Sequence, residues 1–371
     1  MSNNQQTELN VNHIYLKQLD GLRFVAVALV LYDHWLTESN HWPFGALGVN
    51  LFFVLSGFLI TRILLQSKTK NYTNSGGLKN YLKTFYIRRT IRIFPIYYLS
   101  IIVLWLFQNP SVVGKLSWHF LYATNIYIIH YDTWLGVTDH FWSLAVEEQF
   151  YILFPIILFF LNRKYVIPFF IGVIVLSFGL RVYNYEIGAD WKVSYVSMFT
   201  CLDAFAFGGI MAYLILYKNV VFVKLFSNRY FLLISLAALI GQLFLEKNID
   251  DGHNFAVDVL ERLVASIFFF FLIGGAVLGY KGWLKWLLEN PISNYLGKIS
   301  YGLYIYHNFI FNHYHSAANH PVRQMFAAFP LIYTNHLLRL TILFMVAVLM
   351  ASISWYAIEK PINKLKDRFA G

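Results

Sequence analysis

Long apolar stretches recur along nearly the whole chain and constrain its fold more than any other feature. A helix needs about 20 predominantly apolar residues to cross the hydrocarbon core of a bilayer, which is roughly 30 Å thick. Stretches of this kind predict ten membrane-spanning helices, at 21–38, 46–66, 91–108, 143–161, 165–184, 197–217, 230–246, 257–279, 298–316 and 338–358. The sequence therefore predicts an all-α fold, a polytopic membrane helical bundle.

The composition of the chain supports this fold class. Hydrophobic residues make up 58% of the 371 residues and charged residues only 13%, whereas soluble globular proteins carry roughly 25% charged residues. A soluble enzyme, a disordered chain and a disulfide-stabilised scaffold are therefore excluded or disfavoured, and Cys201, the one cysteine, cannot form an intrachain disulfide. The segment 117–130 is too short and too polar to span a membrane and could be interfacial or re-entrant. The segment 282–288 has the Trp, Lys and Leu mixture typical of a helix on a membrane surface.

The positive charges are distributed unevenly between the two sides of the predicted bundle. The net charge is +10, and most Lys and Arg residues lie in loops on one side. The loops on the other side hold only Lys115, Lys192, Lys247 and Arg323. Cytoplasmic loops carry an excess of Lys and Arg, so we expect both termini to be cytoplasmic, and the basic charge needs no nucleic-acid partner. The predicted domains are a tail at 1–17, a membrane domain at 18–364 and a tail at 365–371.

The first predicted helix carries ionisable residues that are costly in hydrocarbon. An Arg or Asp at the centre of a membrane helix costs at least about 2.5 kcal/mol, so such residues usually face a polar cavity or pair with one another. Arg23 and His34 are eleven residues apart, close to three helical turns, so they share one face about 16 Å apart along the axis. His34 can act as a general base, or it can be a buried structural histidine.

The fourth predicted helix begins with WSLAVEEQFY and places Ser143, Glu147 and Tyr151 on one face. Its direction puts Glu147 at a depth like that of His34. A carboxylate and an imidazole at matching depth can form a general-base site, in which one accepts the proton and the other orients it. Glu147 can equally be a helix N-terminal charge that the helix dipole favours.

The segment YIRRTIR holds three arginines, Arg88, Arg89 and Arg92, where the third predicted helix begins. Guanidinium groups match phosphate oxygens in a two-pronged geometry, so this cluster could bind the phosphates of coenzyme A. An ordinary cluster of positive charges at the membrane boundary would look the same. In VLSGF, Ser56 and Gly57 are small residues that allow close packing between helices.

Six segments, read in order, form a family pattern: QLDGLRFVAVALVLYDHW, GVNLFFVLSGFLITR, FYIRRTIRIFPIYYLS, FWSLAVEEQFYILFPIIL, ISYGLYIYHNFI and SWYAIEKPINK. This pattern resembles acyltransferase family 3, the bacterial integral-membrane O-acyltransferases that modify surface polysaccharides and related acceptors. The resemblance extends from residue 18 to about 364.

The resemblance implies roles for particular residues. Arg23 and His34 would be required for transfer, Arg89 and Arg92 would handle the acyl donor, and Glu147 would belong to the active site. The donor would be acyl-CoA, by default acetyl-CoA, with no permanently bound cofactor and no metal. The acceptor would be a hydroxyl of a cell-surface or lipid-linked glycan, at the outer side of the bacterial inner membrane.

The chain departs from the family pattern at several positions. Asn50 stands where an acidic residue is common, and Cys201 stands where an Arg would precede Asp203 and Gly208. Many relatives append a soluble hydrolase-like domain that completes the transfer, and we expect none in this chain. We therefore expect this chain to act alone, as a homodimer or with a separate partner protein. Further residues expected to line the cavity are Tyr151, Ser143, Asn50, Ser56, Asp203, Tyr304 and His307.

The sequence thus predicts a membrane O-acyltransferase with two other functional classes left open. A proton-coupled transporter or exporter would also have about ten spans with intramembrane Arg and His, although no clear internal repeat of the transporter kind is visible. A non-catalytic scaffold that binds acyl chains or lipids is the third hypothesis.

Overall fold

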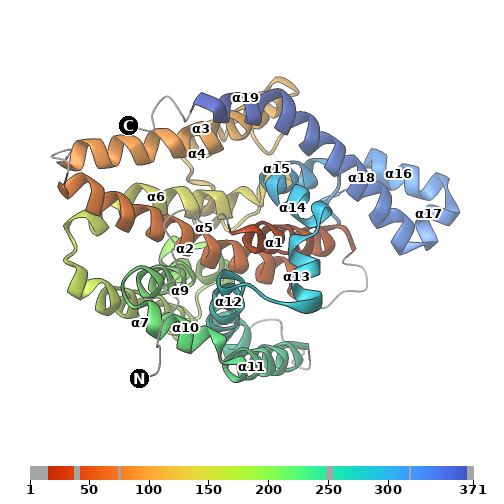
Figure 1. Cartoon of the computed structure of the whole chain (residues 1–371). Helices are drawn as coiled ribbons and strands as arrows, with labels where there is room; N and C mark the ends of the chain where they lie inside the picture. The colour runs from red at the N-terminus through yellow and green to blue at the C-terminus, as the bar shows by residue number, and fades with distance from the viewer. Residues whose placement is uncertain (1–15, 37–41, 74–76, 248–253, 317–318, 366–371) are drawn as a thin grey trace.

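The computed structural model describes residues 16–36, 42–73, 77–247, 254–316 and 319–365, and within these ranges its regular elements are all helical (Figure 1). The all-α prediction is therefore confirmed. The α-helices are α1 (Lys17–Leu36), α2 (Phe44–Thr73), α3 (Gly77–Leu106), α4 (Leu116–Phe120), α5 (Thr124–Tyr131), α6 (Phe141–Phe160), α7 (Val166–Glu186), α8 (Trp191–Val196), α9 (Met198–Tyr217), α10 (Asn219–Ser227), α11 (Arg229–Lys247), α12 (Glu261–Leu278), α13 (Gly282–Glu289), α14 (Pro291–Lys298), α15 (Ser300–Ile310), α16 (Pro321–Ala328), α17 (Pro330–Thr334), α18 (His336–Ser354) and α19 (Lys360–Asn363). Short 3-10 or π turns are η3 (Gly136–Thr138), η4 (Arg163–Tyr165), η5 (Ala256–Leu260) and η6 (Trp355–Glu359).

Seven helical segments among the described residues are long and apolar enough to cross a membrane. They are Phe44–Thr69, Gly77–Leu106, Phe141–Phe160, Arg163–Glu186, Trp191–Tyr217, Arg229–Glu246 and His336–Asn363. The pair Ala256–Leu278 and Gly282–Glu289 passes the same test together, but bends by 89° at its break, and would make eight. The chain is therefore a multi-pass membrane protein by the length and apolar character of its helices, while the count of ten and the cytoplasmic termini stay predictions.

Two predicted spans differ from the helices that the structure contains. The span 21–38 corresponds to α1, which has 20 residues, among them Asp20, Arg23 and Asp33, and is not one of the seven segments that are apolar enough to span. The span 298–316 is wrong as a single helix, because α15 has 11 residues and ends before Phe311, where the backbone becomes extended. Eleven helical residues rise about 16 Å, roughly half the hydrocarbon thickness.

The interior of the bundle is formed where α2 and α9 lie side by side, with α1 packed on α2. Glycines bring the backbones of α2 and α9 into contact. A Cβ atom added to Gly57 would lie 2.2 Å from the carbonyl oxygen of Phe205, and one added to Gly208 would lie 2.2 Å from that of Val54. The close packing predicted from the small residues of VLSGF is therefore confirmed.

The outer helices leave large apolar side chains exposed. In the span windows of α7 and α11 only 22% and 17% of the residues are buried, against 72% in α2. Since lipid chains solvate apolar side chains, these helices form the face that a bilayer would cover. Lys68, near the end of α2, donates hydrogen bonds to the carbonyl oxygens of Leu158 and Leu161 at 3.0 and 2.7 Å. Its ammonium group therefore provides donors for carbonyl groups at the C-terminal end of α6.

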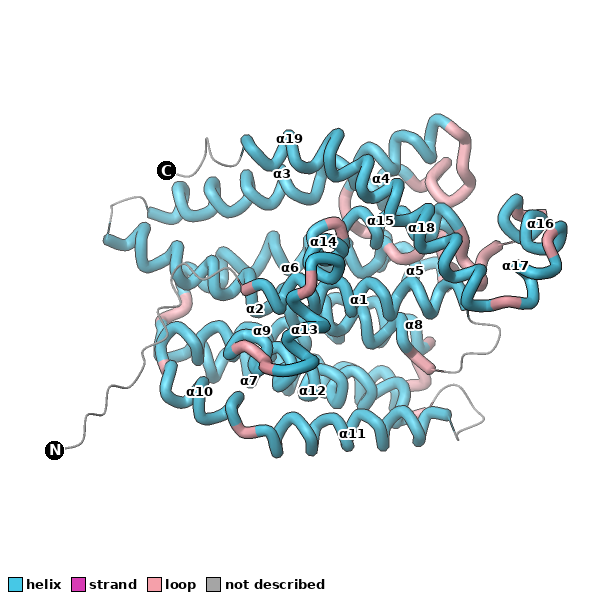
Figure 2. The backbone as a smooth tube through the Cα atoms, turned by 45° about the vertical axis from the view of Figure 1, so that its right-hand side comes forward, coloured by secondary structure: helices cyan, strands magenta, loops and turns pink. Residues whose placement is uncertain are grey.

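Short helices form at the two segments, 117–130 and 282–288, that the sequence did not predict as spans. The segment 117–130 forms α4 and α5, and 282–288 lies within α13, which crosses the bundle at a steep angle to α12 (Figure 2). Trp283 and Trp286 on α13 are each 71% exposed, as expected for a helix that places aromatic side chains at a membrane surface. Most of the predicted tails, 1–15 and 366–371, lies outside the described residues.

Candidate active site

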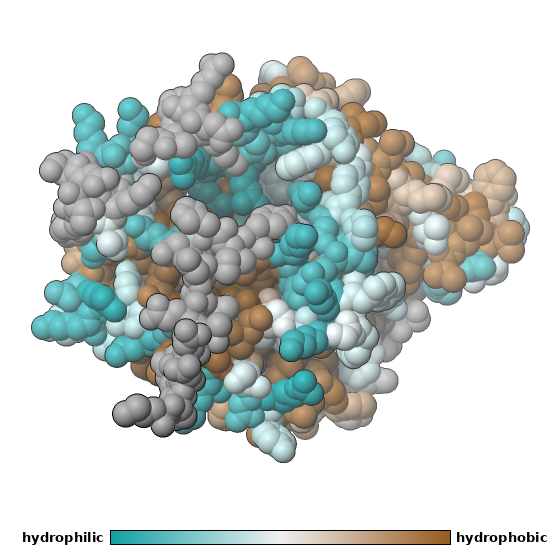
Figure 3. Space-filling view, in the orientation of Figure 1, coloured by the Kyte–Doolittle hydropathy of each residue, from teal (hydrophilic) through white to brown (hydrophobic). Residues whose placement is uncertain are grey.

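A first polar cavity opens between α2, α3, α6 and α15, and we call it the arginine cavity. It has a volume of about 180 Å³, and its walls include three arginines, Arg23, Arg89 and Arg92. In Figure 3 a hollow with hydrophilic walls lies in the upper part of the visible face. In the same view in Figure 1, this region lies just below α3, beside α6. Arg23 also pairs with Asp20 one turn earlier on α1, and the side chain of Arg92 is exposed. The structure therefore gathers three predicted arginines from two distant segments into one site.

A carboxylate and a phenol order the wall of this cavity. Glu147 accepts hydrogen bonds from the hydroxyl of Ser56 at 2.8 Å and from that of Tyr151 at 3.1 Å. The guanidinium of Arg89 lies over the Tyr151 ring, 4.1 Å from its centroid, a cation–π arrangement that fixes the arginine's position. Ser143, one turn before Glu147 on α6, lines the same cavity. The shared helix face predicted for Ser143, Glu147 and Tyr151 is therefore present.

The third arginine of the YIRRTIR cluster stands apart from the other two. Arg88 is exposed and does not line the arginine cavity, whereas Arg89 and Arg92 do. Glu148, which the sequence analysis did not select, lines the cavity and is only 6% exposed. The adjacent pair of glutamates in WSLAVEEQFY was the pattern that could have indicated it.

A second and larger polar cavity, which we call the histidine cavity, has a volume of about 1030 Å³. His34 lines it, together with the aromatic side chains of Trp134, Trp191 and Tyr195. These aromatic rings lie 5.5 to 6.5 Å from one another between centroids. Other lining residues with ionisable side chains are Asp33, Asp139, His140, Arg181, Glu246, Asp258, Glu261, Arg262 and His315. The cavity therefore combines flat aromatic surfaces with charged groups of both signs.

The imidazole of His34 packs against a second imidazole from α15. Its Nδ1 lies 2.8 Å from Nε2 of His307, and the two rings are stacked at 24° with centroids 5.0 Å apart. His307 is completely buried, and His140 lies beside it at 4.9 Å between ring centroids. The structure thus makes His307 a direct neighbour of His34, and it adds His140, which precedes WSLAVEEQFY and was missed.

His34 and Glu147, which the sequence analysis paired by depth, lie in different cavities. Glu147 faces α2 and α3, where its partners are Ser56 and Tyr151, and His34 faces α15. Among the described residues, only Val49 and Tyr304 line both cavities. The hydroxyl of Tyr304 is 2.6 Å from that of Ser143 and donates to the carbonyl oxygen of His140 at 3.1 Å. Tyr304 and Val49 therefore form the boundary between the two cavities.

Two predicted site residues hold helices together. Asn50 is buried and donates to the carbonyl oxygen of Arg262 at 3.1 Å, and its amide also exchanges hydrogen bonds with Ser266. Asp203 pairs with Arg181 at 2.6 Å. In this chain Asp203 thus has an arginine partner from α7, while position 201 holds a buried cysteine. An arginine inside a predicted span was the sequence pattern that could have indicated this partner.

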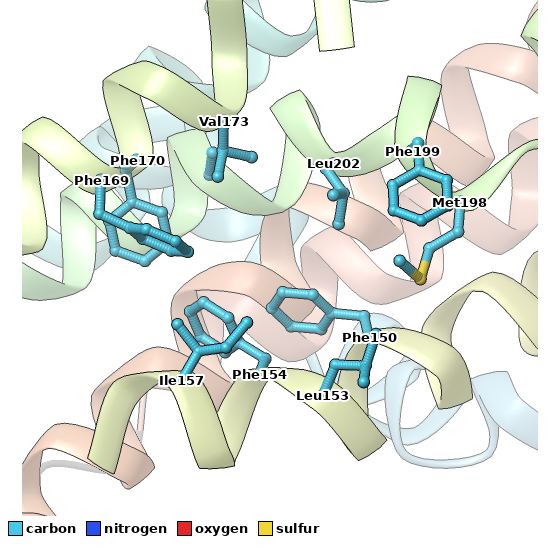
Figure 4. A pocket seen from close by; sticks show the side chains of 11 residues that line it. Phe150, Leu153, Phe154, Ile157, Phe169, Phe170, Val173, Met198, Phe199 and Leu202 are labelled. Carbon is cyan, nitrogen blue, oxygen red and sulfur yellow. The ribbon is translucent and has the colours of Figure 1, made fainter. Parts of the chain in front are cut away.

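A third cavity, of about 130 Å³, lies between α6, α7 and α9 and is apolar (Figure 4). Phe150 and Phe154 on α6 face Phe169 and Phe170 on α7 across it. Its lining contains no titratable or nucleophilic side chain. Within the described ranges, no group of three or more His, Cys, Asp or Glu side chains is placed to hold a metal ion. Of these three cavities, the arginine and histidine cavities are the two that ionisable side chains line.

The fold and these two cavities define a helical multi-pass membrane protein with adjoining polar sites on either side of Tyr304. Residues 16–359 match the family model described as an acyltransferase domain. The chain belongs to this acyltransferase family, in agreement with the resemblance of its six motifs.

Two relatives of the chain from one organism carry the name O-acetyltransferase. The chain is 32% identical over 339 residues to the "Putative O-acetyltransferase" of Staphylococcus aureus (strain COL), a match that covers 81% of this chain and 52% of the relative. It is 28% identical over 381 residues to the O-acetyltransferase OatA of Staphylococcus aureus (strain NCTC 8325), covering 94% of this chain and 57% of the relative. The chain thus spans little more than half the length of these relatives. No solved structure matches it.

Proposed function

We propose that this chain is a membrane O-acyltransferase of the bacterial inner membrane. It transfers an acyl group, by default acetyl, from cytoplasmic acyl-CoA to a hydroxyl of a cell-surface or lipid-linked glycan. The observation that carries the proposal is the adjacency of the arginine cavity and the histidine cavity across Val49 and Tyr304. The family match and the O-acetyltransferase names of the relatives support it, and they favour acyl transfer over the transporter and scaffold hypotheses.

The arginine cavity would take the donor. Arg23, Arg89 and Arg92 present guanidinium groups to one space, and such groups bind phosphate oxygens through charge-assisted hydrogen bonds. Tyr151 holds Arg89 in place, and Glu147 offsets part of the positive charge when the site is empty. The flexible pantetheine arm of coenzyme A would then carry the thioester toward Tyr304. Arg88, which does not line the cavity, would contribute only to long-range attraction.

The histidine cavity would take the acceptor and perform the transfer. A ring nitrogen of His34 accepts the proton of the acceptor hydroxyl while that oxygen attacks the thioester carbonyl carbon. The carbon–sulfur bond then breaks, and the departing thiolate takes the proton from the imidazolium. In the alternative order of events, a ring nitrogen of His34 attacks the thioester carbonyl carbon itself and the coenzyme A thiolate leaves. The acceptor hydroxyl then attacks the acyl-imidazole, which releases His34, and the proton of the hydroxyl ends on the thiolate.

The aromatic surfaces of the histidine cavity support a sugar acceptor. The rings of Trp134, Trp191 and Tyr195 offer flat apolar faces, and the ionisable groups around them can hydrogen-bond hydroxyl groups. A volume of about 1030 Å³ is at the upper end of the range for small-molecule sites, roughly 300–1,000 Å³. We propose that the acceptor reaches this cavity as a free or lipid-linked glycan, presented by the membrane or by a separate partner protein.

The experiment that tests this proposal measures transfer of labelled acetyl from acetyl-CoA in membranes that contain the chain. His34→Ala is expected to lose at least about 100-fold in rate, the lower end of what a general base contributes. Arg89→Ala/Arg92→Ala is expected to raise the KM for the donor. Lys79→Ala, an exposed lysine on α3, is the control and should behave as wild type. Full transfer by His34→Ala would overturn the catalytic assignment, and an unchanged donor KM in the double variant would overturn the donor site.

A further inference from the structure

A chain of hydrogen bonds runs from the backbone of α15 to the imidazole of His34. Nδ1 of His307 lies 2.6 Å from the carbonyl oxygen of Tyr304, one turn earlier on the same helix. Nε2 of the same ring lies 2.8 Å from Nδ1 of His34. Both nitrogens of His307 are therefore engaged, one by a backbone carbonyl and the other by the predicted base.

The carbonyl at one end of this chain determines where each proton sits. A carbonyl oxygen only accepts hydrogen bonds, so Nδ1 of His307 must carry a proton and donate it to Tyr304. His307 is completely buried, and burial disfavours the charged imidazolium. A neutral ring with a proton on Nδ1 has a lone pair on Nε2, so Nε2 of His307 must accept from His34. Nδ1 of His34 then carries a proton, and the lone pair of a neutral His34 is on Nε2.

We propose that His307 is the positioning residue that fixes His34 in the tautomer with a basic Nε2. The inference rests on the proposed function, in which His34 accepts the proton of an acceptor hydroxyl. His34 lines the histidine cavity while its Nδ1 faces α15, so the nitrogen left basic is the one that a substrate can approach. His307 itself is buried away from the reaction and does not exchange a proton with substrate.

The surroundings hold the two rings in this arrangement. The indole of Trp35 donates to the carbonyl oxygen of His307 at 3.4 Å, and the amide of His313 donates to the carbonyl oxygen of His34 at 2.8 Å. His140, the third imidazole, uses its Nε2 to donate to the carbonyl oxygen of Ile305 at 3.2 Å, so it does not compete for His307. The side chain of Asn308 is a further hydrogen-bond partner of the His34 ring, and an Asn308 oxygen that accepts from Nε2 of His34 is the group that would stabilise the opposite tautomer.

Substitutions at His307 separate positioning from packing. A glutamine can present its amide oxygen to Nδ1 of His34 and its NH₂ group to the carbonyl of Tyr304, whereas a leucine can do neither. His307→Gln is expected to keep kcat for labelled acetyl transfer within about tenfold of wild type, and His307→Leu to lower kcat by about 100-fold or more with little change in the donor KM. His130→Leu, a replacement of an exposed histidine on α5, is the matched control.

Nitrogen-15 NMR with labelled histidine determines the tautomer of His34 directly in the unaltered protein, in lipid nanodiscs. The His34 resonance is assigned as the one missing in His34→Ala. We expect a protonated Nδ1 and an unprotonated Nε2 for neutral His34. A protonated Nε2, hydrogen-bonded toward Asn308, would overturn the inference, as would wild-type kcat in His307→Leu. If His34→Ala itself transfers acetyl at the wild-type rate, the proposed function fails first, so the two failures are distinguishable.

Discussion

Arg181 on α7 forms an ion pair with Asp203 on α9 at 2.6 Å, and their side chains are only 1% and 0% exposed. The same guanidinium donates to the carbonyl oxygen of Thr200 at 2.6 Å and to that of Val259 in η5 at 3.1 Å. One arginine therefore connects α7, α9 and the turn that precedes α12. Because α9 packs on α2, this pair supports one wall of the histidine cavity, which Arg181 also lines.

Removal of one partner of this pair should destabilise the protein strongly. Arg181→Met leaves the Asp203 carboxylate buried without its counter-charge, at a cost of about 3–5 kcal/mol. Thermal unfolding in detergent micelles measures the effect, and the midpoint should fall by several degrees. The double variant Arg181→Met/Asp203→Leu should recover part of the loss, since no uncompensated charge remains. A wild-type midpoint for Arg181→Met would contradict this account of the pair.

The contact between α2 and α9 should not tolerate a methyl group at Gly57. A Cβ atom there would lie 2.2 Å from the carbonyl oxygen of Phe205, so Gly57→Ala must push the two helices apart. We expect a fall in the unfolding midpoint and in the yield of folded protein. Gly172→Ala on α7 is the control, because nothing lies within 4 Å of a Cβ atom at that position and alanine is the better helix former by about 1 kcal/mol. Equal stability of the two variants would exclude close packing at Gly57.

A bulky residue at Val49 should separate the donor from the acceptor. Val49 lines both cavities and is 7% exposed, so Val49→Trp would fill the space beside Tyr304. The expected result is a fall of kcat for acetyl transfer by about 100-fold or more, as expected when a base and its substrate are kept apart. Val175→Trp on α7, where the valine is 65% exposed, is the matched control. Transfer at the wild-type rate by Val49→Trp would mean that acyl groups pass elsewhere.

Asp139, in the loop before α6, predicts a pH dependence of stability. Burial raises the pKa of this carboxyl group above its ordinary value, and the hydrogen bond and charge of His315 oppose that rise only in part. Above the raised pKa the folded protein must keep a buried carboxylate, which lowers stability, and this cost disappears as the pH falls toward the unfolded-state pKa of 3.8.

The neutral variant Asp139→Asn avoids that cost. We therefore expect its unfolding midpoint to exceed that of the wild type at pH 8 and the difference to shrink as the pH is lowered toward 4. Unfolding measured at several pH values checks this sign. A variant that is less stable than the wild type at pH 8 would show that the pair with His315 outweighs burial.

The apolar stretches predicted the helical class because membrane helices must satisfy their backbone hydrogen bonds internally, whatever their neighbours. The ends of the helices were harder to predict. The segment 298–316 is rich in aromatic and aliphatic residues, yet α15 stops at Ile310, where the chain turns and places His313 against the end of α1. Hydropathy alone does not predict a contact between residues so far apart in the sequence.

The sequence predicted which side chains share one helix face better than it predicted which side chains touch between helices. Helix periodicity placed Ser143, Glu147 and Tyr151 on one face, and the structure agrees because that relation is local to α6. The pairing of His34 with Glu147 rested on equal depth, which fixes one coordinate and leaves the direction around each helix open. The partnerships of His34 with His307 and of Asp203 with Arg181 depend on how distant helices rotate toward each other, and spacing within one helix cannot supply that.

In the proposed reaction an acyl group passes from the arginine cavity to the histidine cavity, where His34 serves as the base for its transfer to an acceptor hydroxyl. Sealed vesicles of known orientation test it, with labelled acetyl-CoA supplied only at the face where α2 ends and α3 begins. The account predicts labelled ester on acceptors at the opposite face, at a rate that His34→Ala lowers by about 100-fold or more. Label confined to the face that holds the donor, or label at the opposite face that does not depend on His34, would contradict it.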